Sequence, residues 1–480
     1  MEHQRKLFQQ RGYSEDLLPK TQSQRTWKTF NYFTLWMGSV HNVPNYVMVG
    51  GFFILGLSTF SIMLAIILSA FFIAAVMVLN GAAGSKYGVP FAMILRASYG
   101  VRGALFPGLL RGGIAAIMWF GLQCYAGSLA CLILIGKIWP GFLTLGGDFT
   151  LLGLSLPGLI TFLIFWLVNV GIGFGGGKVL NKFTAILNPC IYIVFGGMAI
   201  WAISLVGIGP IFDYIPSGIQ KAENGGFLFL VVINAVVAVW AAPAVSASDF
   251  TQNAHSFREQ ALGLVVAYIL FAVAGVCIIA GASIHYGADT WNVLDIVQRW
   301  DSLFASFFAV LVILMTTIST NATGNIIPAG YQIAAIAPTK LTYKNGVLIA
   351  SIISLLICPW KLMENQDSIY LFLDIIGGML GPVIGVMMAH YFVVMRGQIN
   401  LDELYTAPGD YKYYDNGFNL TAFSVTLVAV ILSLGGKFIH FMEPLSRVSW
   451  FVGVIVAFAA YALLKKRTTA EKTGEQKTIG

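Results

Sequence analysis

Twelve long, continuously apolar stretches constrain the fold of this chain more than any other feature of its sequence. A helix needs about 20 apolar residues to cross roughly 30 Å of hydrocarbon. A membrane barrel would instead alternate apolar and polar residues over about 10 positions. We therefore predict an all-α polytopic membrane protein whose transmembrane helices lie at residues 31–56, 59–80, 107–136, 151–173, 180–205, 226–246, 261–281, 303–329, 345–359, 368–392, 418–439 and 448–464.

The composition supports a membrane protein. Hydrophobic residues make up 57% of the chain and charged residues 10%, whereas charged residues make up roughly 25% of ordinary globular proteins. So few charges cannot cover a soluble protein of 480 residues. This balance argues against a disordered chain, a nucleic-acid-binding protein and a secreted disulfide scaffold. The five cysteines lie in apolar stretches, where they act as small hydrophobic residues. The expected partner is the lipid bilayer, and no nucleic acid is expected.

The basic residues predict the topology, because Lys and Arg gather on the cytoplasmic side of membrane proteins. If the N-terminus is cytoplasmic, 22 of the 28 basic residues lie inside and six lie outside. This split predicts that both termini are cytoplasmic. The first 30 residues lack the apolar core of a signal peptide, so residues 1–30 and 465–480 are predicted to be cytoplasmic tails.

Two of the predicted helices contain interruptions. Gly38 and Pro44 interrupt the first, and Pro243 interrupts the sixth, 199 residues after Pro44. Paired interrupted helices in two halves of a chain indicate the midplane site of a transporter, although membrane helices also tolerate ordinary proline kinks. The repeat interpretation gives a first five-helix repeat at 31–205, a second at 226–392 and two peripheral helices at 418–464.

The sequence lacks the motifs of common enzymes. It has no GxxxxGK[ST] phosphate loop and no HExxH pattern. A GxGxxG match at Gly171, Gly173 and Gly176 follows an apolar stretch rather than a strand, so it does not indicate a dinucleotide site. We expect no enzymatic activity, and no cofactor other than a coupled ion.

Aromatic and amide side chains in the third and sixth stretches can form a binding site. Trp119 and Gln123 are four residues apart and share one helix face. An indole offers a flat stacking surface, and a carboxamide offers donors and an acceptor to a small planar ring with a lactam edge. Trp240, three residues before Pro243, can cover the other side of such a ring. The alternatives are a lipid-facing or core-packed Trp and a Gln that bonds neighbouring helices.

The eighth stretch contains a dense polar run from Thr316 to Asn325. Thr316, Ser319 and Thr320 share a helix face by their spacing, and Asn325 lies on a neighbouring stripe where it can meet a ligand amide. Hydroxyl and carbonyl oxygens suit Na⁺, especially beside a helix whose break frees backbone carbonyls. The alternative is close helix packing through small hydroxyl residues.

The first helix and one intramembrane acid complete the candidates. Carbonyls freed near Gly38 and His41 can contribute to a cation site, and Asn42 can face a ligand. His41 itself is either a proton carrier or a neutral, hydrogen-bonded histidine. Asp374 is the one carboxylate well inside a predicted span, so it is either a proton relay or gate, or a residue of a watery vestibule.

Four segments resemble the nucleobase–cation symporter-1 family, whose members carry purines, pyrimidines, hydantoins and allantoin. They are WMGSVHNVPNY (36–46), KYGVPFAMILRASYG (86–100), WFGLQ (119–123) and STNATGN (319–325). HNVPNY is most similar to the bacterial allantoin-transporting branch. The resemblance implies a LeuT-like fold, with ten core helices in two inverted repeats of five, two peripheral helices, and breaks in helices 1 and 6.

The resemblance also implies residue roles. The ligand would lie between Trp119 and Trp240, with amide contacts from Gln123, Asn325 and Asn42. The family's sodium site matches the hydroxyls of Ser319 and Thr320 and the carbonyls of Gly38, His41 and Thr316. One departure is the stretch 258–264, which is a few residues shorter than in relatives and leaves the start of the seventh helix open.

We therefore expect a bacterial inner-membrane importer of allantoin or a related hydantoin, ureide or nucleobase, driven by Na⁺ or H⁺ and working by alternating access. Its substrate is a small neutral heterocyclic amide, and a monomer is expected. The alternatives are a passive facilitator for the same ligands, a uracil or cytosine permease, and an intramembrane enzyme or receptor.

Overall fold

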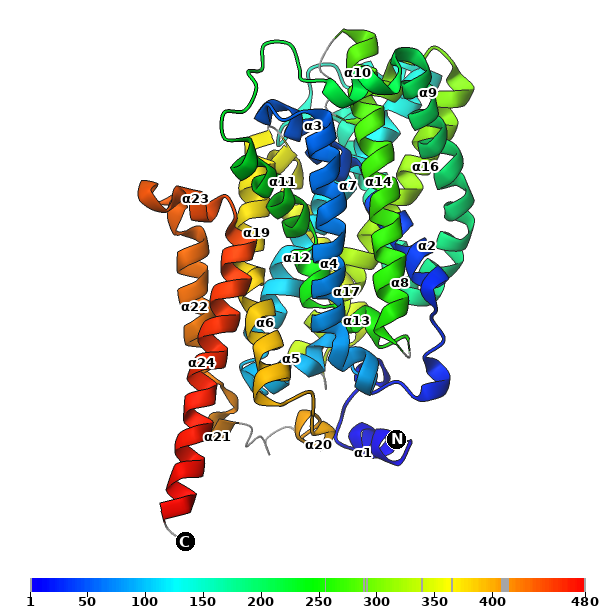
Figure 1. The fold of residues 1–480 in the computed structure, drawn as a ribbon. Coiled ribbons are helices and arrows are strands. Elements are labelled where there is room, and N and C mark those ends of the chain that lie inside the picture. The colour runs from blue at the N-terminus through cyan, green and yellow to red at the C-terminus, as the bar shows by residue number, and fades with distance from the viewer. Residues whose placement is uncertain are drawn as a thin grey trace.

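The computed structural model describes residues 2–254, 256–287, 290, 292–337, 340–363, 366–406 and 414–478. In this part of the chain, long helices run side by side through the molecule (Figure 1). Among the described residues there is one pair of strands, β1 (Thr150–Leu151) and β2 (Leu154–Ser155), which forms a short antiparallel hairpin. The predicted all-α fold is confirmed.

All twelve predicted spans contain helix. The helices of the first half are α1 (Glu2–Gln10), α2 (Thr29–Val40), α3 (Val43–Phe52), α4 (Thr59–Tyr87), α5 (Phe91–Tyr99), α6 (Leu105–Gly108), α7 (Ala116–Ile138), α8 (Leu156–Ile191), α9 (Gly197–Val206) and α10 (Ile208–Asp213). Those of the second half are α11 (Gly225–Val239), α12 (Ala241–Val245), α13 (Ser248–Thr251), α14 (Phe257–Tyr286), α15 (Val293–Gln298), α16 (Leu303–Asn321), α17 (Ile327–Ile336), α18 (Tyr343–Leu356), α19 (Gln366–Ala389), α20 (Leu401–Leu404), α21 (Tyr414–Gly417), α22 (Leu420–Leu434), α23 (Glu443–Ser446) and α24 (Ser449–Thr478).

Wider π-helical turns join several of these helices into longer spans. They are η4 (Leu109–Ala115), η6 (Tyr192–Gly196), η7 (Ala322–Ile326) and η9 (His390–Val394). Among the described residues, eight helices are long and apolar enough to cross a membrane, and a pair bent by 87°, at 440–446 and 449–465, is a ninth if its two helices form one span. Three shorter apolar helices are Val43–Leu55, Gly225–Val239 and Tyr343–Leu356.

The first span is broken, as the sequence predicts. α2 ends at Val40 and α3 begins at Val43, with His41 and Asn42 between them. Asn42 caps α3 by accepting a hydrogen bond from the Asn45 amide nitrogen at 3.1 Å. Pro44 therefore lies in the first turn of α3, where its missing N–H costs nothing, rather than inside a kinked helix.

The sixth span is also broken. α11 ends at Val239, and Trp240 has non-helical dihedral angles (φ −94°, ψ 4°) before α12 begins. Asn80 on α4 donates to the carbonyls of Ala244 and Val245 at 2.8 and 2.9 Å. These side-chain hydrogen bonds satisfy carbonyls that the end of α12 leaves without helical partners.

The fourth and fifth spans are two separate segments, as predicted: they cover Leu156–Gly176 and Lys182–Val206. Gly176 (φ 59°, ψ −156°), in a conformation that glycine adopts readily, interrupts α8 between them. One boundary differs from the prediction. The seventh helix begins at Phe257 rather than 261, because Ser256 caps it by accepting from the Arg258 amide nitrogen at 3.1 Å. The predicted start was therefore wrong by about one helical turn.

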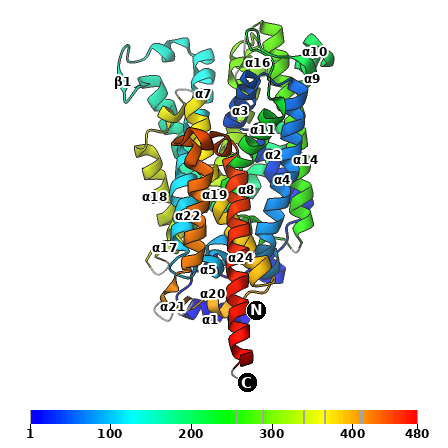
Figure 2. The ribbon, with the colours of Figure 1, turned by 60° about the vertical axis from the view of Figure 1, so that its left-hand side comes forward.

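The last two spans, α22 and α24, lie beside α19 at the edge of the bundle (Figure 1), and the turned view brings them to the front (Figure 2). Glycine allows this close packing, because a Cβ on Gly385 of α19 would lie 2.4 Å from the Val454 carbonyl oxygen of α24. Helix α1 and the C-terminal end of α24 lie at the same end of the bundle (Figure 1). That placement accords with an even number of membrane crossings.

Candidate substrate-binding site

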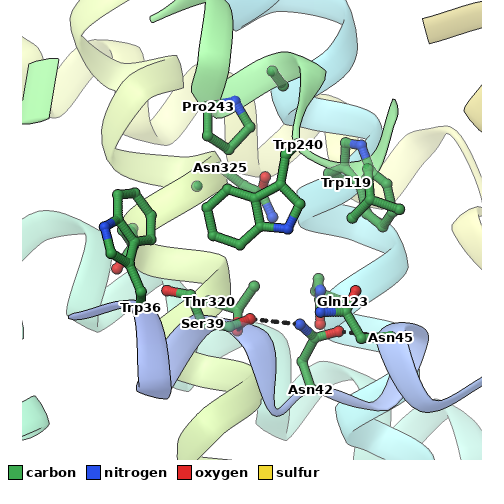
Figure 3. A pocket seen from close by; sticks show the side chains of 14 residues that line it. Trp36, Ser39, Asn42, Asn45, Trp119, Gln123, Trp240, Pro243, Thr320 and Asn325 are labelled. Carbon is green, nitrogen blue, oxygen red and sulfur yellow. Dashed lines mark hydrogen bonds between the residues drawn. The ribbon is translucent and has the colours of Figure 1, made fainter. Parts of the chain in front are cut away.

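A small cavity lies where the two helix breaks meet α7 and α16–α17. All five residues predicted to contact substrate lie in its lining: Asn42, Trp119, Gln123, Trp240 and Asn325. They come from sequence positions far apart, and Figure 3 shows them around one space. The volume of this cavity that the centres of water molecules can occupy is only about 50 Å³, which is room for very few waters. A ligand must therefore part the side chains to enter.

Helix α7 supplies two of the lining groups from one face. Trp119 is 6% exposed and packs edge-on against Phe372 of α19, with ring centroids 5.2 Å apart. Gln123 is 2% exposed. The Trp119 Nε1 and the Gln123 Oε1 are both buried without a hydrogen-bond partner among the described residues. Buried polar groups are rarely left unsatisfied, so these two atoms are suited to meet a polar ligand.

The break in the sixth span positions Trp240. Its ring packs edge-on against Trp36 at 4.9 Å and against Tyr268 at 5.2 Å between centroids. Trp36 also lines the cavity, and its Nε1 is buried without a partner among the described residues. The sequence analysis did not assign Trp36 to the site, although it opens the WMGSVHNVPNY segment.

Asn42 lies in the lining, but its amide is already engaged. The Oδ1 accepts from the Asn45 amide nitrogen, and the Nδ2 donates to the Ser39 carbonyl at 2.7 Å, as Figure 3 shows. The Asn42 side chain therefore links the end of α2 to the start of α3. Its amide retains one N–H and one lone pair for a ligand.

The predicted cation site gathers oxygen atoms from α2 and α16. The Thr320 hydroxyl lies 3.3, 3.0 and 2.9 Å from the carbonyl oxygens of Gly38, Ser39 and Thr316. The Ser319 Oγ is buried without a partner among the described residues, and a Cβ on Gly38 would lie 2.7 Å from it. Hydroxyls and carbonyls are the hard ligands that alkali cations prefer, and an unsatisfied Ser319 hydroxyl fits a ligand role. The Ser39 carbonyl is a member of the cluster that the sequence analysis missed.

The His41 side chain contacts aromatic residues. Its Nδ1 lies 2.9 Å from the Tyr46 hydroxyl, and its ring stacks on Phe195 with centroids 4.5 Å apart. This environment supports the neutral, hydrogen-bonded alternative for the side chain. A role for the His41 carbonyl stays a prediction.

With this geometry in place, the chain was compared with known proteins. The sequence model of the family described as permeases for cytosine/purines, uracil, thiamine and allantoin matches residues 19–453. The chain belongs to this family. It is a multi-pass membrane transporter rather than an enzyme.

Two bacterial relatives cover nearly the whole chain. A protein of Escherichia coli (strain K12) named "Putative allantoin permease" is 99% identical over 484 aligned positions that span 100% of both chains. An allantoin permease of Bacillus subtilis (strain 168) is 38% identical over 458 positions, or 94% of this chain and 93% of that one. Because this chain has 480 residues, at least four of the 484 aligned positions are gaps in this chain.

Solved structures share the LeuT-like fold. A closed conformation of Mhp1, a nucleobase-cation-symport-1 family transporter with bromovinylhydantoin bound, has a TM-score of 0.75 at 23% identity and covers 96% of each chain. MhsT in complex with L-phenylalanine has a TM-score of 0.55 at 12% identity, over 90% of this chain and 98% of that chain. The predicted fold class is confirmed.

Asp374 lies apart from the cavity of this permease. Its Oδ2 forms an ion pair with the Nζ of Lys437 at 2.6 Å, and its carbonyl accepts from the Ser449 hydroxyl at 3.2 Å. Both partners belong to the segments that follow α19 at the edge of the bundle. These contacts indicate that Asp374 fastens the peripheral helices, and its role as relay or gate stays a prediction.

A second, wider cavity lies between the N-terminal segment and the substrate cavity. The centres of water molecules can occupy about 550 Å³ of it. Thr323 lines both this cavity and the smaller one. Asp249, just beyond α12 and outside the spans, lines it together with Lys20. Burial raises the pKa of Asp249 to about 6, although a hydrogen bond from the Phe91 amide nitrogen and the charges of Arg111 and Lys20 act to lower it. The sequence analysis passed over Asp249 because it lies outside every predicted span.

Proposed function

We propose that this permease imports allantoin, or a closely related hydantoin or ureide, by cation-coupled alternating access across the bacterial inner membrane, with both termini in the cytoplasm. The observation that carries the substrate class is the lining of the cavity. None of its fourteen described lining residues is charged, while three indoles and several carboxamides surround the space. Such a site favours a neutral planar amide over a charged metabolite, because a buried charge would lack a matched partner.

The names of the relatives support allantoin within this class. Proteins 99% and 38% identical to the chain are named for allantoin. Allantoin is uncharged near neutral pH and has a planar ring rich in amide edges, so it matches the unsatisfied Trp119 Nε1 and Gln123 Oε1.

Two features support cation coupling. Five oxygen atoms from α2 and α16 converge beside the cavity, and Na⁺ is the ion that such oxygens suit. Thr320 belongs to both sites, because its side chain also lines the substrate cavity. Cation binding would therefore order the wall against which substrate rests.

The test is uptake of radiolabelled allantoin by cells that lack other allantoin transporters, with and without Na⁺ and with an uncoupler. Trp119→Ala and Gln123→Ala should abolish saturable uptake while membrane abundance is unchanged. Leu167→Ala is the matched control, because Leu167 is 60% exposed on the outside of α8. Normal uptake by both site variants would refute the site.

The same assay separates the proposal from its alternative. A passive facilitator would equilibrate allantoin but never accumulate it above the outside concentration, and collapsing the Na⁺ and proton gradients would leave the initial rate unchanged. Competition by unlabelled hydantoin, uracil and cytosine ranks the substrates.

A further inference from the structure

Three buried asparagines connect α8 to the substrate cavity through α16. Asn169 is 1% exposed, Asn321 is 0% exposed, and Asn325, which lines the cavity, is 6% exposed. The Asn321 Nδ2 lies 3.1 Å from the Asn169 Oδ1, and the Asn325 Nδ2 lies 2.9 Å from the Asn321 Oδ1. The three side chains form a continuous row of amide hydrogen bonds that we call the amide chain.

Backbone carbonyls fix the direction of this chain, because a carbonyl oxygen can only accept. The Asn169 Nδ2 donates to the Phe165 carbonyl at 2.8 Å, so the Asn169 Oδ1 must face Asn321. The Asn321 Nδ2 then donates both to that oxygen and to the Phe120 carbonyl at 3.2 Å, with the weakly accepting Cys124 Sγ at 3.3 Å.

The direction passes on to the residue that faces the ligand. Both N–H groups of Asn321 point at acceptors, so its Oδ1 faces Asn325. Asn325 must therefore donate a hydrogen bond to that oxygen from its Nδ2. A flipped Asn325 would place two carbonyl oxygens against each other in a buried site. The Asn325 Oδ1 and the second N–H of its Nδ2 are therefore the side-chain groups that this residue has left for a ligand, and the Oδ1 is its one side-chain acceptor.

We propose that Asn169 and Asn321 are positioning residues for substrate selection: through Asn325 they hold the Asn325 Oδ1 in place as a hydrogen-bond acceptor, and this oxygen selects for an N–H on the substrate. The proposal rests on the proposed function and deepens it. A cyclic ureide or hydantoin that turns a ring or ureido N–H toward Asn325 satisfies the site. A ligand whose N–H is methylated at that position leaves the Asn325 oxygen without a donor.

Gln123 differs from Asn325 in this respect. No hydrogen bond among the described residues fixes its amide, and its Oε1 is buried without a partner. Gln123 can turn to suit a donor or an acceptor on the ligand, whereas Asn325 cannot. The amide chain therefore makes the Asn325 side of the site the more selective one.

The experiment measures competition against radiolabelled allantoin uptake by hydantoin, 1-methylhydantoin and 3-methylhydantoin. In the unchanged protein, one methyl isomer should bind about 10-fold more weakly than hydantoin, the effect of one lost hydrogen bond in a buried site. In Asn321→Leu this ratio should fall to about 2-fold or less, because the Asn325 amide can then rotate. Asn169→Ala should lower the ratio less, because Asn321 keeps the Phe120 carbonyl.

Asn188→Leu is the matched control. Asn188 is another buried asparagine of α8, 5% exposed, and its Nδ2 donates to the Thr184 carbonyl four residues earlier at 2.7 Å, as Asn169 does to Phe165. It has no place in the amide chain, so its replacement should leave the ratio unchanged. A purely structural defect would weaken all three ligands alike, and the ratio separates this case from repositioning.

Unchanged ratios in Asn321→Leu and Asn169→Ala, with measurable uptake, would overturn the inference while leaving the proposed function intact. If Asn321→Leu does not reach the membrane, Asn321→Ala replaces it in the same comparison. Absence of allantoin uptake by the unchanged protein would instead overturn the proposed function, and the inference with it.

Discussion

Gly38 brings α2 against α16 at the cation site, and replacing it with alanine tests that site directly. A Cβ at this position would lie 2.7 Å from the Ser319 Oγ and 3.5 Å from the Leu187 Cδ2. The first distance is below any normal contact, so the Ser319 side chain must leave its position. The added methyl group therefore both strains the contact and removes one oxygen from the cluster.

The magnitude follows from these two effects. Displacing a side chain from its rotamer costs about 0.5–1.5 kcal/mol, and each 1.4 kcal/mol corresponds to about a tenfold change in affinity. With the loss of one oxygen ligand added, Gly38→Ala should raise the Na⁺ concentration for half-maximal uptake by about tenfold or more. The stabilisation of the purified protein by Na⁺ in thermal unfolding should fall in parallel.

A double variant isolates the contact. Ser319→Ala removes the hydroxyl without a clash, and Gly38→Ala combined with Ser319→Ala should be no worse than Ser319→Ala alone, because the atom that clashes is gone. Gly171→Ala, where nothing lies within 4 Å of the added Cβ, is the control. Additive defects in the double variant, or a normal Na⁺ response in Gly38→Ala, would refute the reasoning.

Three further predictions concern stability. Asp374→Asn should lower the free energy of unfolding by no more than about 1 kcal/mol, because the ion pair of Asp374 with Lys437 is partly exposed. The variant should keep its uptake. Loss of uptake at normal protein abundance in the membrane would instead support a role as a gate. The raised pKa of Asp249, about 6 against 3.8, means that the folded protein binds more protons than the unfolded chain between these values. Stability should therefore fall as pH rises from about 4 to 6, by at most about 3 kcal/mol, and thermal unfolding of Asp249→Asn should lack this slope; an equal slope in the variant would contradict the assignment. Gly84→Ala should destabilise the protein by about 1–3 kcal/mol in the same assay, since its Cβ would lie 2.4 Å from the Thr251 Oγ1; an unchanged unfolding temperature would count against that packing.

Hydrophobic runs made the helices predictable, because lipid requires about 20 apolar residues in each span. The residue types around Trp119 and Asn325 made the lining of the cavity predictable, because polar groups inside a membrane are costly and tend to face the interior of the bundle. Helix ends were less predictable. The seventh helix begins a turn early, at Phe257, because the hydroxyl of Ser256, which caps it, lies outside the apolar run.

The groups that position the site were not predictable from the sequence. Asn169 is a single amide in an apolar stretch, and nothing in its own helix indicates that it meets Asn321, 152 positions later. Trp36 likewise gains its place only when the first and sixth spans cross. Such contacts depend on how helices pack, and helical periodicity carries no information about the identity of the neighbouring helix.

The gap between α2 and α3 is bridged by two side-chain amides. Asn42 and Asn45, both on the α3 side, donate to the carbonyls of Ser39 and Val40 on the α2 side. Each half-helix keeps its own backbone ladder, so tilting one half against the other stretches these two bonds and leaves the rest in register. The break in the first span is therefore a hinge: α2 can tilt against α3 at the cost of these two hydrogen bonds, and neither helix has to unwind.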